Sequence, residues 1–408
     1  MKIGVLTLHM KEWNDHYRSS HYLMLRLARR WPVVWIDPPH EAREAPGVAV
    51  RAVRRFRTPE ADRQLHVYSP PGWLPRVYRP RALSTRLERA RLRQAARRLR
   101  AAGCDRIVLY CWHPQFLDST DLVKHDMLVY HVVDEYSYSP EDPPTPPRER
   151  EMIARADQVI LHSPGLMEKK GPLAPDRTMF VPNGVNFEAF AASGPEPEEL
   201  TGIPHPRVGY CGVLKRQMDW ELIRSLIDTR TDLHWVFVGH WQDDHSELEP
   251  VREWLKGRPN VHLTGRVPAP RLAEFPAHFD AAIMPYKVDG YTQYIYPLKL
   301  HEYLAAGTPI VGSPVRTLRE FSGVVELAEG CDQWSMALDR ALSPGSREAS
   351  AVAARRSIAR QHDWDQLADR IAGLIEQRLG VEPARHRPGS RPATAARTRP
   401  AASIASVR

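Results

Sequence analysis

Short apolar segments alternate with helical segments along the first half of this chain, and that alternation constrains the fold more than any other feature. Apolar runs bounded by turn residues predict strands, and amphipathic or basic runs between them predict helices. The predicted strands cover residues 3–8, 33–36, 106–110, 127–133 and 158–162, and the predicted helices cover residues 20–30, 85–102 and 148–155. Strands and helices in this order are typical of an α/β fold with a doubly wound parallel sheet.

The second half of the chain repeats this pattern after residues 191–206, whose Pro, Gly and Glu content predicts a linker. Its predicted strands cover residues 207–211, 234–238, 261–264, 281–285, 310–312 and 324–327, and its helices cover about 219–228, 246–256, 270–277 and 332–342. With 408 residues, two or three domains are expected. We therefore predict one domain over 1–190, a second over 206–360 and a final helix over 361–379. The remainder, 381–408, is rich in Ala, Arg, Pro and Ser and is predicted to be a disordered basic tail.

The chain carries no sign of a membrane span or of a secreted protein. It has no run of about 18 apolar residues, which a spanning helix needs. Residues 1–8 resemble a strand, and the charged residues that soon follow do not suit a signal peptide. The four cysteines lack the spacing of a metal site or a disulfide framework. A cytoplasmic protein is the simplest expectation.

The net charge of +8 is concentrated in a basic arm, residues 51–100, which holds 15 arginines and only 3 acidic residues. Aromatic residues such as Phe56, Trp73 and Tyr78 are interspersed with these arginines. Basic and aromatic residues together suit an anionic membrane surface, and they also suit nucleic acid. A solvated helix face is the third interpretation of the same residues.

Residues 296–313 form the most informative segment for function. Pro297 suits a helix start, 298–306 predicts a short helix, and Gly307 suits its left-handed end, before a buried strand. Lys299 and Glu302 lie three residues apart and therefore share one helix face. A helix start that carries a cation suits a phosphate, and an acid one turn later suits a sugar hydroxyl. The alternative is a plain helix–strand pair of an α/β core.

This segment resembles the donor-nucleotide motif of GT-B glycosyltransferases of family four (group 1), in the subgroup with Pro-Leu-Lys-Leu-x-Glu-Tyr-Leu-Ala-Ala-Gly. The resemblance covers roughly residues 1–378. It implies two Rossmann-like domains whose sheets face a central cleft, with the last helix crossing back to the first domain. Glu302 matches the second acid of the family's E-x7-E pattern, which holds the ribose of a nucleotide sugar. Tyr294 stands where the first acid is usual, a departure that the subgroup shares.

Other segments match further donor-binding parts of the family. After the strand 207–211, Lys215 and Arg216 are candidates to pair a diphosphate, and Val213 occupies the usual Arg position. The turn after the strand 261–264 matches the backbone that contacts the nucleobase. The donor-binding residues implied by the resemblance are Gly212, Lys215, Arg216, Arg266, Val267, Tyr291, Thr292, Pro297, Leu298, Lys299 and Glu302.

In the first half, the candidate residues follow predicted strands, where ligands of parallel sheets bind. Asp134 stands where family four often has a His, and its carboxylate suits orienting an acceptor hydroxyl or accepting its proton. Helix or turn capping is an equal alternative for Asp134, and a structural role is an alternative for His113. With Lys299, these two residues form the predicted catalytic set. Trp13, His16 and Glu135 are the predicted acceptor-binding residues.

The resemblance implies a glycosyltransferase that moves a sugar from a UDP-, GDP- or dTDP-sugar to an acceptor hydroxyl, with retention, in polysaccharide or glycoconjugate biosynthesis. The acceptor would be a glycan, a lipid-linked molecule or a small molecule. No bound cofactor or metal is expected. For the basic arm, the resemblance favours a membrane surface over nucleic acid, and thus a peripheral place at the inner face of a membrane. The alternatives are a sugar-nucleotide epimerase of the same fold and a non-catalytic scaffold.

Overall fold

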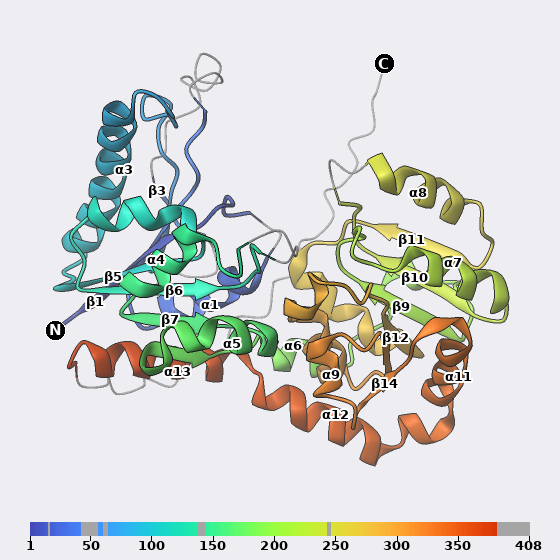
Figure 1. The fold of residues 1–408 in the computed structure, drawn as a ribbon. Helices are drawn as coiled ribbons and strands as arrows, with labels where there is room; N and C mark the ends of the chain where they lie inside the picture. The colour runs from blue at the N-terminus through green and yellow to red at the C-terminus, as the bar shows by residue number, and fades with distance from the viewer. Residues whose placement is uncertain (15–16, 42–55, 60–63, 138–142, 243–245, 382–408) are drawn as a thin grey trace, which may run out of the picture.

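The computed structural model describes residues 1–14, 17–41, 56–59, 64–137, 143–242 and 246–381. The chain forms two lobes, each built on one sheet, which lie side by side (Figure 1). The first sheet has eight strands in the order β3-β4-β2-β1-β5-β6-β7-β8, and the second has six in the order β11-β10-β9-β12-β13-β14. The predicted fold class, with two parallel-sheet domains, is confirmed.

The first sheet is parallel except for its edge strand β3, which pairs antiparallel with β4. Its strands are β1 (Ile3–Leu8), β2 (Val33–Ile36), β3 (Phe56–Arg57), β4 (Leu65–Tyr68), β5 (Arg106–Cys111), β6 (Met127–Val132), β7 (Gln158–Leu161) and β8 (Thr178–Phe180). Of these, β3, β4 and β8 were not predicted. The edge strands β3 and β8 are only partly buried, and His66 interrupts the apolar run of β4, so none of the three leaves a continuous apolar run in the sequence.

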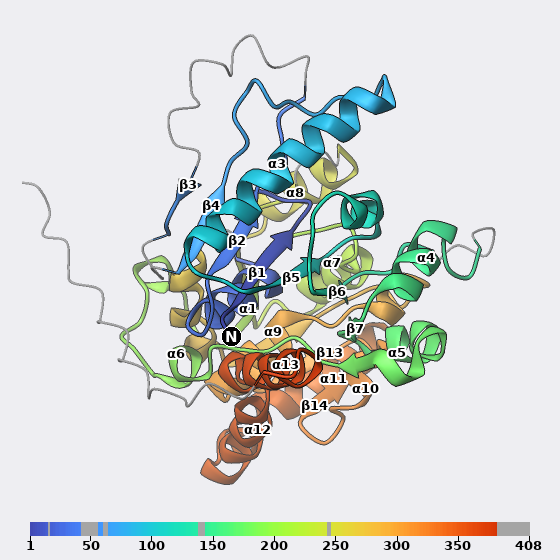
Figure 2. The same ribbon diagram turned by 90° about the vertical axis from the view of Figure 1, so that its left-hand side faces the viewer.

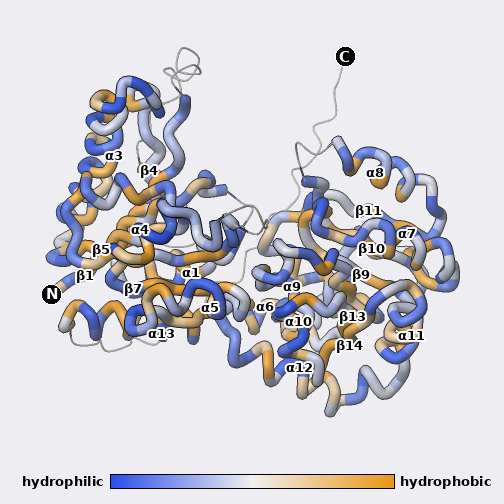
Figure 3. The backbone as a smooth tube through the Cα atoms, viewed as in Figure 1, coloured by the Kyte–Doolittle hydropathy of each residue, from blue (hydrophilic) through white to orange (hydrophobic). Residues whose placement is uncertain are grey.

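Helices cover both faces of the first sheet, and successive strand residues alternate between them. Val5 and Val33 pack against α1 (Ser19–Ala28) and α13 (Trp364–Arg378), whereas Leu6 and Val34 pack against α3 (Arg81–Ala101) and α4 (Pro147–Arg155). Figures 1 and 2 show α3 and α13 on opposite sides of the sheet. In Figure 3 the hydrophobic colour gathers on the strands between these helices.

The second sheet is fully parallel. Its strands are β9 (Arg207–Cys211), β10 (His234–Val238), β11 (Val261–Gly265), β12 (Ala281–Met284), β13 (Ile310–Gly312) and β14 (Val325–Leu327). One face packs against α6 (Phe187–Ala191), α9 (Leu298–Ala306), α10 (Arg316–Arg319) and α12 (Ala349–Gln361), and the other against α7 (Trp220–Thr229), α8 (Glu249–Lys256) and α11 (Gly330–Leu342).

The local structure differs in places from what the sequence predicted. Residues 270–277 form two 3-10 turns, Ala269–Glu274 and Pro276–His278, because Pro276 lacks the N–H that a continuous α-helix needs. The predicted linker 191–206 packs in part, since Leu200 and Ile203 are buried in the core of the second lobe. The final helix begins at Trp364 rather than at residue 361.

The chain passes between the lobes at two adjacent segments, near Val185 and near His362. Val185 N donates to His362 O (2.9 Å), and Trp364 N donates to Val185 O (3.0 Å). A Cβ added at Gly184 would lie 2.6 Å from His362 O, so the two segments pack backbone to backbone. Beyond this crossing, α12 packs on α9 of the second lobe and α13 on α1 of the first. The predicted return of the last helix to the first domain is confirmed.

Candidate functional site

The strand order of the second sheet reverses between β9 and β12, and parallel α/β sheets bind ligands at such a point. Gly212 follows β9, and Tyr286 with residues 287–296 follows β12. The helix α9 then runs from Leu298 to a left-handed end at Gly307 (φ 83°), as the sequence predicted. Pro297 lies one position earlier than predicted, at the N-cap. Most of the predicted donor-binding residues therefore meet at the carboxyl edge of one sheet.

Two glycines leave the backbone at this edge of the sheet without side chains. Gly212 (φ 133°) and Gly239 (φ 149°) adopt conformations that residues with a side chain rarely take. A Cβ added at Gly212 would lie 3.3 Å from Nζ of Lys299, and one added at Gly239 would lie 2.0 Å from Gly212 O. The backbone after β9 thus lies directly against the Lys299 side chain.

Two lysines flank the buried phenol of Tyr286. Nζ of Lys299 donates to Oη of Tyr286 (3.1 Å) and lies 4.8 Å from the ring centroid of Tyr210. Nζ of Lys215 lies 5.6 Å from the ring centroid of Tyr286. Burial lowers the pKa of Lys215, and burial likewise opposes the charge of Lys299, but Tyr210, Tyr286 and Glu302 outweigh it and raise the pKa of Lys299. The switch point therefore carries two adjacent cations, which suits a diphosphate.

Glu302 lies one turn after Lys299 on α9 and is half-buried. Among the described residues, no side chain or backbone group forms a hydrogen bond or ion pair with its carboxylate. Burial raises the pKa of Glu302 to about 7, against the attraction of Lys299. In the free protein this raised pKa contributes stability below the ordinary value of 4.5, and that stability is lost as the pH rises towards 7. A half-buried acid that has no hydrogen-bond or ion-pair partner in the described part of the chain suits ligand hydroxyls that donate to it.

The remaining predicted donor-binding residues do not contact the two lysines in the interactions described above. The side chains of Arg216 and Arg266 are exposed, and Val267 packs against the core of the second lobe. Oγ1 of Thr292 donates to Lys287 O (2.6 Å), and Asp289 accepts from the backbone N–H of Tyr291 (3.0 Å) and that of Thr292 (2.8 Å). Thr292 therefore shapes the loop, and its predicted contact with the sugar stays a prediction.

Asp134, in the turn after β6, faces this site from the first lobe. The hydroxyl of Tyr291 donates to its carboxylate, and the charge of Lys215 acts on it, so the two lobes meet here. Burial raises the pKa of Asp134, while the hydrogen bond from Tyr291 and the lysine charges pull it down. Oδ1 of Asp134 also accepts from the backbone N–H of Glu135 (3.0 Å). Asp134 thus contacts the backbone of its own turn, and its carboxylate also faces the lysine-lined site.

His113 begins the 3-10 helix Pro114–Asp121, where its Nδ1 accepts from Gln115 N (3.1 Å). Its ring packs edge-on against Tyr136, with 4.8 Å between centroids. Burial, with Arg148 nearby, lowers the pKa of His113 to about 4. The ring is therefore neutral near pH 7, and with Nδ1 accepting, Nε2 carries the hydrogen. In this state His113 suits donating a hydrogen bond.

The two predicted acceptor-binding residues that the structure describes, Trp13 and Glu135, are both buried. Trp13 is buried edge-on against Trp35 (centroids 5.1 Å apart), and His16 lies outside the described residues. Glu135 points into the first lobe, where its carboxylate meets Lys169 (3.4 Å) and Lys170 (3.3 Å). The proposed contacts of these residues with an acceptor stay predictions.

Sequence reasoning missed Tyr210 and Tyr286, the two phenols beneath Lys299. Tyr210 lies on β9 and Tyr286 just after β12, both almost fully buried. Buried tyrosines on or beside a strand are ordinary core residues in most proteins, so no pattern distinguishes them. The contacts of Tyr210 and Tyr286 with Lys299 become visible only in the structure.

Comparison with known proteins shows which sequences and folds this chain resembles. Residues 205–343 match the family described as "Glycosyl transferases group 1". A relative from Bacillus subtilis (strain 168), described as "Putative teichuronic acid biosynthesis glycosyltransferase TuaH", is 31% identical over 232 residues. That match covers 55% of this chain and 57% of the relative.

Solved structures of the same fold cover almost the whole described chain. Sucrose-phosphate synthase from Thermosynechococcus elongatus has a TM-score of 0.67 at 15% identity, covering 92% of this chain and 99% of that one. An α,α-trehalose-phosphate synthase (UDP-forming) from Burkholderia vietnamiensis has a TM-score of 0.65 at 16% identity, covering 92% and 98%. Anabaena HepE, solved with UDP and glucose, has a TM-score of 0.64 at 16% identity, covering 92% and 99%.

The two sheets and the returning last helix give this chain the GT-B fold of these solved structures. Its second lobe carries the match to group 1 glycosyl transferases.

Proposed function

We propose that this protein is a glycosyltransferase that moves a sugar from a nucleotide-sugar donor to an acceptor hydroxyl in polysaccharide or glycoconjugate biosynthesis. One observation carries the proposal: Lys215 and Lys299 meet at the switch point of the second sheet, opposite Asp134 of the first lobe. Cations in this position offset the negative charge that grows on a leaving diphosphate. The family match and the UDP recorded with Anabaena HepE support a nucleotide-sugar donor.

Each side chain receives one role in this proposal. Lys215 and Lys299 bind the diphosphate beside the bare backbone at Gly212, and Glu302 accepts from the ribose hydroxyls. Asp134 orients the acceptor hydroxyl or takes its proton. Retention of anomeric configuration follows from the family resemblance, and the configuration of the product tests it. Conversion of the nucleotide sugar to its epimer in the absence of an acceptor would instead favour the epimerase alternative.

A thermal-shift screen tests the donor class. We expect one of the UDP, GDP or dTDP nucleotides, or its sugar conjugate, to raise the melting temperature, since a hundredfold excess over Kd adds about 2.7 kcal/mol. Glu302→Ala should reduce the shift, whereas Glu326→Ala, which removes a partly exposed acid on β14 that pairs with Arg340, should leave it unchanged. If no nucleotide shifts the wild type, the scaffold alternative is favoured.

The pH dependence of donor binding tests the role of Glu302. Its pKa of about 7 means that the carboxylate ionises between pH 6 and 8. An ionised acceptor binds hydroxyls more strongly than a neutral one, so a nucleotide sugar should bind about fivefold more tightly at pH 8 than at pH 6. Calorimetry should show this change in the wild type and none in Glu302→Gln. An equal pH dependence in both proteins would assign the titration to another group.

We further propose that the described part of the basic arm places the enzyme on an anionic membrane. On α3, Arg86, Arg89, Arg93 and Arg97 recur every three to four residues and so share one face. Within the described residues, none of these four forms an ion pair. Trp73 and Tyr78 in the segment before this helix and Leu83 in its first turn are exposed by 58%, 64% and 43%. No helix in the described ranges is both long enough and apolar enough to cross a bilayer.

Co-sedimentation with vesicles tests this surface. The wild type should bind vesicles that contain phosphatidylglycerol and not those of phosphatidylcholine alone. Each arginine near an anionic surface contributes about 1 kcal/mol, so Arg86→Glu, Arg93→Glu and Arg97→Glu together should weaken binding by at least about a hundredfold. Equal binding by wild type and triple variant would contradict the proposal, as would binding to DNA but not to vesicles.

A further inference from the structure

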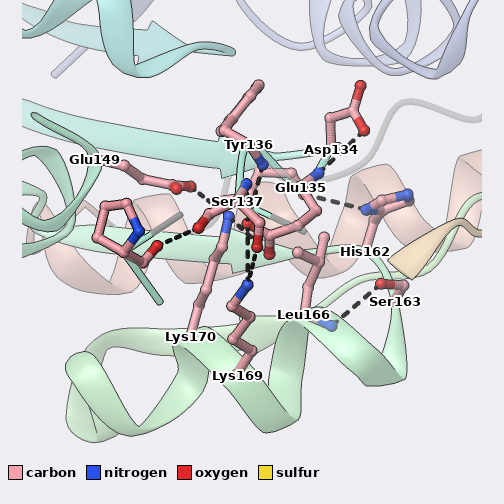
Figure 4. A network of polar contacts seen from close by, with 12 residues as sticks. Asp134, Glu135, Tyr136, Ser137, Glu149, His162, Ser163, Leu166, Lys169 and Lys170 are labelled. Atoms are coloured by element: carbon pink, nitrogen blue, oxygen red, sulfur yellow. Dashed lines mark hydrogen bonds and ion pairs between the residues drawn. The ribbon is translucent and has the colours of Figure 1, made fainter. Parts of the chain in front are cut away.

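A largely buried ionic network lies behind Asp134 in the first lobe (Figure 4). Lys170, at the end of α5 (Pro164–Lys170), contacts Glu135 (3.3 Å) and Glu149 (2.7 Å). Glu149 also accepts from the hydroxyl of Tyr130 (3.0 Å). The preceding residue, Lys169, contacts Glu135 (3.4 Å) and donates to the backbone carbonyl of Ser137. Two lysines of one helix thus converge on the turn that follows β6.

Such a network is costly, which argues for a purpose other than stability. The side chains of Glu135, Glu149 and Lys170 are each 0% exposed. Burying charged groups costs several kcal/mol per ion, and well-packed apolar residues often stabilise a fold equally well. An ionic network does, however, fix the positions of its groups, because each carboxylate oxygen must lie close to particular donors.

The geometry that Glu135 imposes concerns the turn that carries Asp134. One oxygen of Glu135, Oε1, accepts from the backbone N–H groups of Tyr136 (2.9 Å) and Ser137 (2.9 Å). The backbone N–H of Glu135 in turn donates to Asp134 (3.0 Å). The backbone after Asp134 and the Asp134 carboxylate are therefore held by the same residue.

The same network reaches the second lobe. Nζ of Lys169 lies 5.0 Å from the ring centroid of Tyr294, the residue at the position of the family's first acid. A Cβ added at Gly165 on α5 would lie 2.6 Å from Gln293 O, so α5 packs closely against this loop. The loop also carries Tyr291, the hydrogen-bond partner of Asp134. The network therefore contacts the loop of the proposed donor site at two places: Lys169 contacts Tyr294, and Asp134 contacts Tyr291.

We propose that Glu135 is a positioning residue that holds Asp134 towards the donor site by clamping residues 135–137 against Lys169 and Lys170. This inference rests on the proposed glycosyltransferase function, in which Asp134 meets the acceptor. It gives Glu135 a role through Asp134 in place of the direct acceptor contact predicted from the sequence.

Three variants of the full-length protein separate positioning from simple structural support. Glu135→Leu removes the acceptor for both backbone N–H groups, Glu135→Gln keeps an acceptor without the charge, and Glu149→Gln removes a carboxylate beside the same Lys170 without touching the turn. If Glu135→Leu does not fold, Glu135→Asp replaces it, because it keeps the charge but withdraws the carboxylate by one methylene. Amide hydrogen exchange at Tyr136 and Ser137 is measured alongside kcat and the donor KM.

We expect Glu135→Leu to accelerate exchange at Tyr136 and Ser137 and to lower kcat at least tenfold, with the donor KM within about twofold of wild type. Glu135→Gln should recover most of the loss, and Glu149→Gln should leave both measurements close to wild type. Unchanged exchange in Glu135→Leu would overturn the inference, as would an equal loss of kcat in Glu149→Gln. If the wild type transfers no sugar, the proposed function fails, and the exchange result alone decides whether Glu135 clamps the turn.

Discussion

Replacing Lys299 by methionine should lower kcat/KM for sugar transfer by about 100- to 1,000-fold, the loss typical when one preorganised charge partner of a transition state is removed. Lys299 is held by Tyr286 and Tyr210 before any ligand arrives, so its charge needs no rearrangement during reaction. Methionine keeps most of the side-chain volume against these rings. The melting temperature should therefore change by no more than a few degrees.

The measurement is steady-state transfer with the donor identified by the thermal-shift screen. Arg216→Met is the matched control, because Arg216 is a cation of the same segment as Lys215 whose side chain is exposed. Its kcat/KM should stay within about threefold of wild type. A folded Lys299→Met enzyme with wild-type kcat/KM would remove Lys299 from the site. A loss of kcat/KM in Arg216→Met but not in Lys299→Met would indicate that Arg216, and not Lys299, binds the diphosphate.

Asp134→Asn should lower kcat by about 100- to 10,000-fold while the donor KM changes little, since asparagine cannot accept a proton. Asparagine retains an oxygen for Tyr291 and for the backbone N–H of Glu135, so the turn should stay in place. In the wild type, kcat should fall as the pH falls through the pKa of Asp134. Burial raises that pKa above its ordinary value, and Asp134→Asn should abolish this acid limb.

Tyr291→Phe is the informative companion, because it removes the hydrogen bond to Asp134 and leaves the carboxylate intact. We expect a loss of tenfold or less in kcat, with the acid limb retained. A large loss of donor affinity in Asp134→Asn, with kcat unchanged, would place Asp134 on the donor and not on the acceptor. If neither donor affinity nor kcat falls in Asp134→Asn, the capping alternative for Asp134 is favoured.

Local sequence was sufficient for α9 and its neighbours. Pro297 before the helix, Gly307 after it and the spacing of Lys299 and Glu302 depend on residues within one or two helical turns. The same holds for most strands of both sheets, whose burial on two faces leaves continuous apolar runs. Elements without such a local signal were missed, among them the short strands β3, β4 and β8 and the helix α12.

The candidate site itself depended on contacts between distant parts of the chain. Glu135 is one residue from Asp134, yet one side chain points into the first lobe and the other towards the second. Tyr210 and Tyr286 became part of the site only because β9 and β12 lie side by side in the sheet. Spacing along the chain carries no information on these pairings, since they follow from strand order and from the packing of the two lobes.

The sequence alone determined the fold class and the helix Leu298–Ala306 with Lys299 on it, because these follow from short-range patterns of apolar, charged, Pro and Gly residues. Tertiary structure alone decided which charges face one another: Lys299 against the two tyrosines, Tyr291 against Asp134, and the α5 lysines against Glu135. The physical reason is that electrostatic and hydrogen-bond interactions act over a few ångströms in space. Such distances exist only once strands separated by tens of residues, and lobes separated by more than a hundred, have packed together.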